Sequence, residues 1–365
     1  MGLVSARVRF DGTDETVWFD LPDSCKPHPD LIATAFAALF GSAFDQWIYD
    51  GPISSSALKR LETVTGAEWK TPLYDVSGRE PGTGTVLNFS GGFDSLAALA
   101  LYGRDLPLVS MDFGAKFKRE REFFELFDTA IVATNARQFE KSWTFMGIGA
   151  ILLADYFQAG YISFGSILEA SPWGMVSHTG PRNGNPIFSV ASLEETNPLV
   201  GLTEFGTTML AARAFPEVID QSLISLADRH TEKYLRKHLL LQLVRNRIGS
   251  TDVGYYPEPS LKDPLVFGAN FAADFLAPGL WSHCDASRWM LPTQGFEKWA
   301  EGKSFNFYWS ELPGVAYHPD PQTQRNIVTN KHDFGVQTYK AADWGDLREV
   351  LTVLSFFHPI PGQHW

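Results

Sequence analysis

Residues 85–113 read TVLNFSGGFDSLAALALYGRDLPLVSMDF, and the rest of the chain can be placed by working outward from them. Residues 86–89 are mostly apolar and have the length of one buried strand. The next three residues, Ser90-Gly91-Gly92, predict a tight turn, because glycine adopts positive φ at no steric cost. Asp94 and Ser95 are residue types that cap helices, so a helix is expected to begin here.

This helix is expected to end at Gly103, because glycine commonly follows the last turn of a helix. Leu96, Leu99 and Ala100 lie before it at helical spacing. Residues 106–113 form a second apolar run, so the unit predicts strand, glycine turn, helix and strand. Such a turn directs backbone N–H groups and a helix N-terminus at one point, which suits an anion such as phosphate.

The segment SGGFDS resembles the SGGxDS pyrophosphate loop of the N-type ATP pyrophosphatases, the PP-loop superfamily. It is not a Walker A loop, because no lysine follows the glycines. The resemblance implies that the loop backbone approaches the phosphates of ATP, that the two serine hydroxyls donate to them, and that Asp94 holds Mg²⁺ between phosphate oxygens. The alternative is an ordinary strand-to-helix turn. The ATP-binding residues that the resemblance implies here are Ser90, Gly91, Gly92, Phe93, Asp94 and Ser95.

Strands and helices continue to alternate after residue 85, which predicts a parallel sheet with helices on both faces. The expected elements after the first unit are helix 116–127, strand 129–133, helix 141–159, strand 161–164, loop 171–200, loop and helix 197–219, and strand 221–227. The resemblance implies an α/β fold of the HUP or Rossmann-like class, with a parallel five-stranded sheet in the order 3-2-1-4-5. Ligands are then expected at the carboxyl ends of the strands.

Two further strand ends are therefore candidate ATP contacts. Asp112 and Phe113 end the second strand, where the resemblance implies adenine or ribose contacts. Gly165 and Ser166 follow the fourth strand, where it implies the α-phosphate or substrate edge. A turn cap and a loop hydroxyl remain the alternatives for Asp112 and Ser166. Three residues nearby are weaker candidates, with a solvated loop side chain as the alternative: Glu169 for substrate or magnesium, and His178 and Arg182 for a ligand.

The chain is expected to form three domains. Residues 1–82 are interpreted as an N-terminal α+β appendage, residues 83–250 as the ATP pyrophosphatase domain and residues 251–365 as a mixed or helical lobe over the substrate. The appendage is expected to contain a hairpin at residues 6–19, helices at 31–44 and 54–65, and a glycine-rich linker at 78–84.

Residues 228–248 predict a basic helix. The nearest members of the superfamily, the cyanodeazaguanine synthase-like proteins, carry a zinc-binding cysteine cluster in this region. Those cysteines are absent here, so no zinc is expected. Lys233 and Lys237 are candidate catalytic cations, with Arg236 beside them, because a cation near departing pyrophosphate would neutralise its developing charge. A solvated basic face is the alternative.

Charge and cysteine content restrict the partners and the compartment. The net charge of −12 disfavours tRNA, whose phosphate backbone requires a basic face. The two cysteines, Cys25 and Cys284, form no CxxC or zinc spacing, which fits a reducing cytoplasm. The first residues lack the pattern of a signal peptide, and no apolar run approaches the ~20 residues that span a bilayer. His283-Cys284-Asp285 is not expected to be catalytic, since neighbours in sequence rarely converge.

These observations favour an AMP-forming ligase. It is expected to use ATP and Mg²⁺ to adenylate an oxygen of a small-molecule substrate and release pyrophosphate, after which an amine or ammonia attacks to form a C–N bond. A sensor or partner-binding subunit that binds ATP or AMP without turnover is one alternative. A PP-loop sulfur transferase is another, although neither cysteine lies near a motif. A homodimer is left open.

Overall fold

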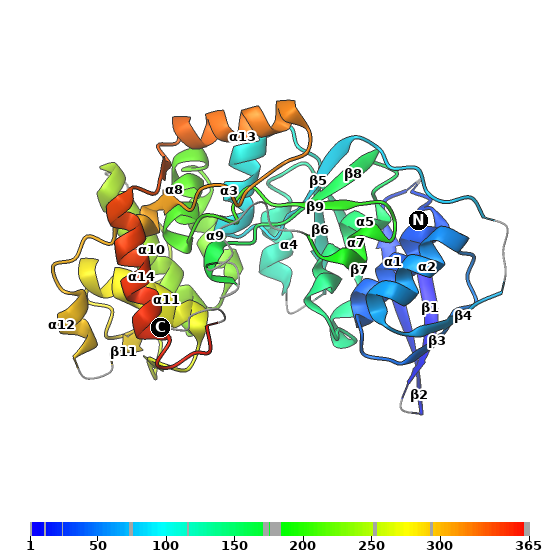
Figure 1. The fold of residues 1–365 in the computed structure, drawn as a ribbon, viewed down its shortest axis with the longest axis horizontal. Helices are drawn as coiled ribbons and strands as arrows, with labels where there is room; N and C mark the ends of the chain where they lie inside the picture. Colours follow the sequence, from blue (N-terminus) through cyan, green and yellow to red (C-terminus); the bar gives the residue numbers. More distant parts are fainter. Residues whose placement is uncertain are drawn as a thin grey trace. The chain divides into compact units, whose positions relative to one another are not determined.

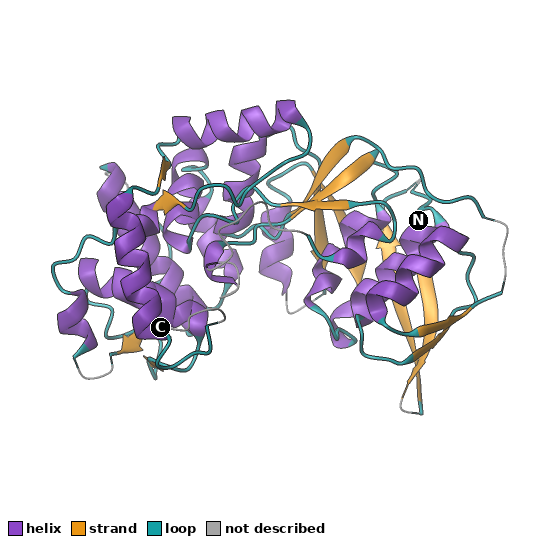
Figure 2. Ribbon diagram, in the orientation of Figure 1, coloured by secondary structure: helices purple, strands orange, loops and turns teal. Residues whose placement is uncertain are grey.

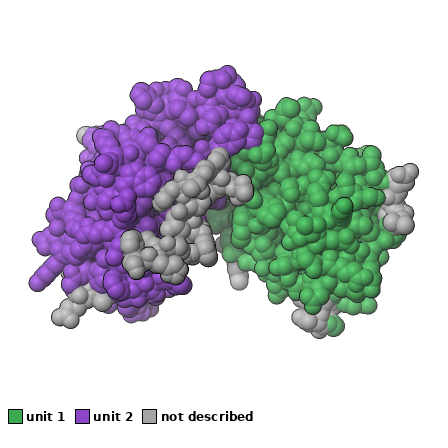
Figure 3. All heavy atoms as spheres, in the orientation of Figure 1, with its two compact units in different colours: residues 1–90, 105–164, 183–196 green, residues 91–104, 165–182, 197–365 purple. Residues whose placement is uncertain are grey.

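The computed structural model describes residues 2–10, 12–23, 25–72, 76–114, 117–170, 175, 184–250, 254–292 and 295–360. The chain divides into two compact units, and neither is a continuous segment (Figure 3). Unit 1 contains residues 1–90, 105–164 and 183–196. Unit 2 contains residues 91–104, 165–182 and 197–365.

Unit 1 is built on a seven-stranded, mostly parallel sheet in the order β1-β2-β7-β6-β5-β8-β9 (Figure 1). The β1–β2 hairpin turns at Gly12 (φ 75°) and joins the edge of β7 antiparallel, and the other pairs are parallel. The mixed α/β class with a mostly parallel sheet is as expected. The strands are β1 (Gly2–Phe10), β2 (Thr13–Leu21), β5 (Gly84–Asn88), β6 (Leu108–Asp112), β7 (Thr129–Thr134), β8 (Ala159–Ser163) and β9 (Glu194–Thr196).

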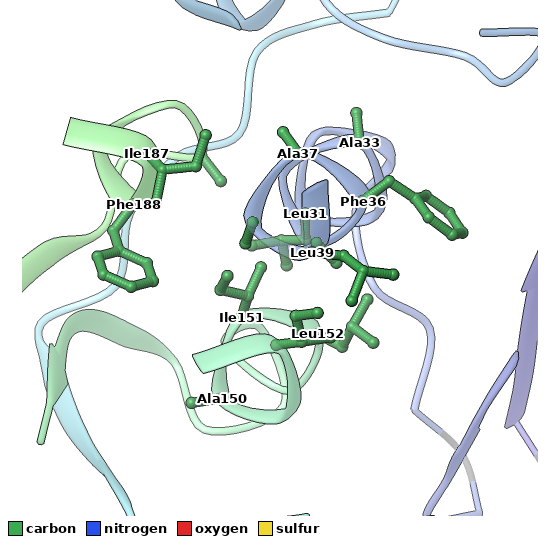
Figure 4. Close-up of a cluster of buried hydrophobic side chains, with 14 of the residues drawn as sticks. Leu31, Ala33, Phe36, Ala37, Leu39, Ala150, Ile151, Leu152, Ile187 and Phe188 are labelled. Atoms are coloured by element: carbon green, nitrogen blue, oxygen red, sulfur yellow. The ribbon is translucent and has the colours of Figure 1, made fainter. Parts of the chain in front are cut away.

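Side chains of α1, α5 and α7 gather in one buried apolar core of unit 1 (Figure 4). A separate short parallel pair, β3 and β4, stacks Trp47 on Trp69 with ring centroids 4.6 Å apart. These elements are α1 (Pro29–Phe40), β3 (Gln46–Ile48), α2 (Ser55–Thr65), β4 (Glu68–Lys70), α4 (Lys118–Phe124), η2 (Ala136–Gln138), η3 (Trp143–Gly147), α5 (Ile148–Leu152) and α7 (Pro186–Ser189). The hairpin and the helices expected near 31–44 and 54–65 are confirmed.

Three expectations about unit 1 are wrong. The long helix at 141–159 is η3 followed by the short α5, because the chain must turn at Gln158 (φ 50°) to enter β8. The loop at 171–200 contains α7 and the edge strand β9 among its described residues. The charged helix expected at 116–127 is reduced to α4.

The segment expected as a linker at 78–84 is anchored in unit 1. Arg79 is buried, pairs with Asp155 at 2.7 Å and donates to the carbonyls of Ala159 and Ala191. A Cβ on Gly82 would overlap the carbonyl oxygen of Gln158 at 1.8 Å, so this close approach requires glycine. The glycines here serve backbone packing rather than flexibility.

Unit 2 is dominated by helices (Figure 2). The last strand expected at 221–227 is wrong, because these residues lie in α9, whose Ile219 and Leu223 face the core at helical spacing. The elements are α3 (Phe93–Tyr102), η4 (Leu168–Ala170), α8 (Glu204–Ala214), α9 (Ile219–Leu226), α10 (Glu232–Ile248), β10 (Leu265–Val266), α11 (Phe271–His283), β11 (Met290–Leu291), α12 (Phe296–Ala300), η5 (Asn306–Trp309), β12 (Ser310–Glu311), α13 (Pro321–Asp333), β13 (Gln337–Thr338) and α14 (Ala341–Leu354). Among the described residues, no helix combines the length and apolar character needed to cross a membrane.

Candidate functional site

The glycine turn opens α3 in unit 2. Gly91 has φ 71°, a conformation that favours glycine. Gly92 is the N-cap, with φ −78° and ψ 167°, and α3 ends at Gly103 as expected. The expectation that Asp94 and Ser95 cap the helix is therefore wrong, since both lie inside its first turn. Because glycine has no side chain, the N-cap leaves the first backbone N–H groups to other partners.

Gly165 packs directly on this helix start. A Cβ at Gly165 would lie 2.9 Å from the carbonyl carbon of Asp94 and 3.0 Å from the amide nitrogen of Ser95. Gly165 therefore belongs with the loop in unit 2, as a packing residue. Its neighbour Ser166 is half-buried, and its carbonyl accepts a hydrogen bond from the Asn197 side chain at 2.9 Å.

The Phe93 and Ser95 side chains point into the protein. Phe93 is fully buried, and this burial includes its backbone. Ser95 is also buried, and its hydroxyl donates to the carbonyl of Gly92 at 2.9 Å. Both residues belong to the first turn of α3.

Asp94 is held by two donors from different helices. The Thr207 hydroxyl on α8 donates to Oδ1 at 2.5 Å, and the Lys237 ammonium on α10 donates to Oδ2 at 3.1 Å. The Asp94 side chain remains 27% exposed. A carboxylate has about four lone-pair positions, so two donors leave room for further ligands. An oxygen-preferring cation such as Mg²⁺ fits this partly exposed carboxylate.

Lys237 lies within hydrogen-bonding and ion-pair distance of two carboxylates. Its side chain is 2% exposed, and Nζ lies 3.4 Å from Glu204 Oε1 as well as close to Asp94. Burial disfavours the ammonium, but Asp94 and Glu204 outweigh it and raise the pKa of Lys237. The side chain is thus a charged, fixed contact between α10, α3 and α8, and the alternative of a solvated basic face does not apply to it.

The charged cluster continues beyond Lys237. Arg236 pairs with Glu204, and its Nε lies 2.7 Å from Glu232 Oε1, which also accepts from Trp289 at 2.9 Å. Burial raises the pKa of Glu204, but Arg236 and Lys237 lower it well below the usual range. Lys233, the other candidate cation on α10, is exposed.

Glu169 is the unexpected member of this region. The alternative that it is a solvated loop carboxylate is wrong, since η4 buries it to 2% exposure. Oε1 accepts the backbone N–H of Glu204 at 2.7 Å, while Oε2 has no partner among the described residues. Burial, followed by the charge of Glu204, raises the pKa of Glu169 to about 8. Burial therefore favours the protonated form of this carboxyl.

Three candidate ATP residues belong to unit 1. Ser90 is exposed. Asp112 ends β6, accepts the N–H of Gly114 at 2.9 Å and lies 3.2 Å from Arg121. Phe113 packs against Phe117 and Phe145. The turn-cap alternative for Asp112 is thus realised, and its nucleotide contact stays a prediction. His178 and Arg182 lie outside the described residues.

The sequence did not reveal Thr207 and Glu204. Both lie on α8, which is mostly apolar and buried almost all round. Polar side chains inside such a helix need hydrogen-bonding partners. A glutamate and a threonine in this apolar segment were therefore a detectable signal of a buried polar contact. What the sequence does not supply is the partner, which is 113 residues away for Thr207 and Asp94.

The two cysteine thiols have raised pKa values. Burial, then Asp285, raises the pKa of Cys284 to about 11, and burial raises that of Cys25. Among the described residues, no three His, Cys, Asp or Glu side chains are grouped to hold a metal ion. Comparisons with protein-family models, with curated proteins and with solved structures give no match. The functional assignment therefore depends on the residues of the chain itself.

Proposed function

We propose that this protein binds MgATP on residues 91–95 and transfers AMP to an oxygen of a small-molecule substrate, with release of pyrophosphate. The observation that carries the proposal is the Gly91-Gly92 turn opening α3 beside an Asp94 carboxylate that Lys237 and Thr207 hold in place. The strand order β7-β6-β5-β8-β9 supports the same assignment, because the resemblance implies 3-2-1-4-5.

The helix start supplies the phosphate contacts in this proposal. The first-turn N–H groups of α3 carry the positive end of the helix dipole, and the N-cap glycine does not cover them. Gly165 packs on the same backbone, which keeps the turn from shifting. The β- and γ-phosphates are assigned to this point.

Asp94 is the residue that would hold Mg²⁺. When bound with nucleotide, the ion would neutralise charge on the departing pyrophosphate. Lys237 orients the Asp94 carboxylate, because its ammonium is buried between Asp94 and Glu204. We therefore assign Lys237 to positioning, and the exposed Lys233 remains the candidate for direct phosphate contact.

The chemistry requires no protein nucleophile. A carboxylate, amide or urea-like oxygen of the substrate forms a bond to the α-phosphorus, and the bond to the pyrophosphate oxygen breaks. An amine or ammonia then attacks the activated carbon, and AMP leaves with the oxygen. Positioning and charge stabilisation supply the rate. A sulfur transferase is less favoured, since burial holds the pKa of Cys284 high.

A binding protein without turnover is the second candidate. It is favoured by the existing contacts of Asp94, whose two oxygens already accept one hydrogen bond each. Turnover separates the two functions, because a sensor would bind ATP and leave it intact.

Product analysis tests the proposal. The protein is incubated with ATP, Mg²⁺, an ammonium salt and the small-molecule fraction of a cell extract, and the products are followed by phosphorus NMR. We expect AMP and pyrophosphate in equal amounts, and a loss of about 10²-fold in rate for Asp94→Asn, the scale of one preorganised contact. ADP and phosphate as the only products would exclude attack at the α-phosphorus. Tight ATP binding without turnover would favour the sensor.

A further inference from the structure

Two adjacent threonines on α8 differ in what their hydroxyls do. Thr207 and Thr208 are both fully buried. Thr207 donates to Asp94 Oδ1 at 2.5 Å, and the Glu204 carbonyl lies farther from it, at 3.4 Å. The Thr208 hydroxyl has no partner among the described residues. The chain thus contains a matched pair of buried hydroxyls, of which one contacts the carboxylate.

The hydrogen bond from Thr207 restricts a rotation of the Asp94 carboxylate that the contact with Lys237 does not restrict. An ammonium is a compact point charge that accepts many orientations of a carboxylate. With Lys237 on Oδ2 alone, the Asp94 group can still rotate about χ2. A second donor on Oδ1 from another helix removes that rotation, and a hydroxyl–carboxylate bond is stronger than one between neutral groups.

We propose that Thr207 is a positioning residue that orients the free lone pairs of Asp94 toward the magnesium ion of MgATP. This inference rests on the proposed function. It says that the orientation of the metal ligand at that site depends on a residue that does not touch ATP. Partners that orient metal ligands commonly contribute 10- to 100-fold in metal affinity.

The test compares three variants in two assays. Thr207→Val removes the hydroxyl at nearly equal volume, Thr207→Ser restores it, and Thr208→Val makes the same change where no bond is lost. The first assay measures ATP affinity by calorimetry across a Mg²⁺ series, and the second measures pyrophosphate release across the same series. We expect Thr207→Val to raise the half-saturating Mg²⁺ concentration by about tenfold in both assays. Thr207→Ser and Thr208→Val are expected to remain within about twofold of wild type.

A purely structural role for Thr207 predicts other results. An unchanged Mg²⁺ requirement in Thr207→Val, or an equal rise in Thr208→Val, would overturn the inference. If Thr207→Val does not fold, Thr207→Ala replaces it, with the melting temperature as a control. Failure of the proposed function is distinguishable, because wild type would then show no Mg²⁺-dependent ATP binding and no pyrophosphate release.

Discussion

Lys237 is the buried cation on which the charged cluster of unit 2 depends. Its ammonium lies 3.1 Å from Asp94 and 3.4 Å from Glu204. Removing one partner of a buried ion pair leaves an uncompensated charge and typically costs about 3–5 kcal/mol. A neutral substitution at this position leaves Asp94 without its cation and leaves Glu204 with Arg236 alone.

We predict that Lys237→Met lowers the free energy of unfolding by about 3 kcal/mol or more, on the scale of broken buried ion pairs. Lys233→Met, one turn earlier on α10 at an exposed position, is the control and should change it by less than ~0.5 kcal/mol. Chemical denaturation of both variants measures the difference. Equal stability of the two variants would show that Lys237 is not held as a buried ion-pair partner.

Glu169 predicts a pH dependence of stability. Burial raises its folded pKa to about 8 from the ordinary 4.5, so the folded state keeps a proton that the unfolded state releases. Its contribution is complete below pH 4.5 and falls as the pH rises toward 8, by up to about 1.4 kcal/mol per pH unit. Glu204 has the opposite effect on the pH dependence of stability. Because its folded pKa is lowered, its carboxylate stabilises the fold above the ordinary pKa of 4.5, and this stabilisation is lost as the pH falls.

Glu169→Gln tests this sign. Glutamine has nearly the shape of the protonated acid and cannot ionise, so the fall in unfolding free energy between pH 6 and pH 8 should be smaller by about 2 kcal/mol than in wild type. Denaturation at the two pH values measures it. A decline as steep in Glu169→Gln as in wild type would assign the pH dependence to other groups.

At the level of single residues, the sequence identified the residues of the glycine turn. It did not identify the residues from distant segments that contact them. The loop SGGFDS identified the glycine turn and Asp94 as a candidate carboxylate. Thr207 and Glu204 reach the site through the packing of α8, which periodicity cannot place. Glu169 was a weak candidate for substrate or magnesium, with a solvated loop carboxylate as the alternative, whereas its carboxyl is buried and accepts from the N-terminus of α8.

At the scale of elements, Gly165 controls how closely its segment approaches α3. A Cβ on Gly165 would lie 2.9 Å from the carbonyl carbon of Asp94 and 3.0 Å from the amide nitrogen of Ser95. Both are backbone atoms, which cannot move aside as the end of a flexible side chain can. We predict that Gly165→Ala costs about 1–3 kcal/mol, as overpacking does, and weakens ATP binding by displacing the start of α3. Thermal unfolding and ATP titration measure the two effects.

Gly345→Ala is the control for this prediction. Gly345 lies in α14, and an added Cβ would meet nothing within 4 Å. Alanine is the better helix former, so this variant should gain roughly 0.5–1 kcal/mol and keep its ATP affinity. If Gly165→Ala behaved in the same way, the close packing on α3 would be irrelevant to the site.

Element prediction succeeded where one periodicity dominated. The hairpin, α1, α2, β5, α3 and β7 are confirmed, because each has a clear apolar pattern and a capping or turn residue. Residues 221–227 were taken for a strand, but only seven residues are too few to separate a buried strand from a buried helix. The predicted helix 141–159 was too long, because its apolar residues continue past the end of α5, through a turn and into β8.

At the scale of the whole molecule, the chain crosses between units at points that carry no linker signal. Each entry into unit 2 comes within three residues of the end of β5, β8 or β9. One of these crossings divides SGGFDS itself, between Ser90 and Gly91. The glycine-rich segment at 78–84, which did look like a linker, lies inside unit 1. Composition therefore cannot locate such boundaries.

The proposed function places the ATP phosphates at the Gly91-Gly92 turn and the start of α3. Gly92 is the position for a test, because its φ of −78° and ψ of 167° are open to any residue, so valine there adds bulk without forcing a left-handed backbone. Gly345→Val makes the same substitution in α14, where an added Cβ meets nothing within 4 Å.

The decisive measurement is calorimetric titration of ATP, with Mg²⁺ present, into wild type, Gly92→Val and Gly345→Val. We predict saturable binding of one ATP to wild type and to Gly345→Val, and no measurable binding to Gly92→Val at an unchanged circular dichroism spectrum. ATP binding by Gly92→Val with the affinity of wild type, or no binding by wild type, would contradict the assignment of the phosphate site.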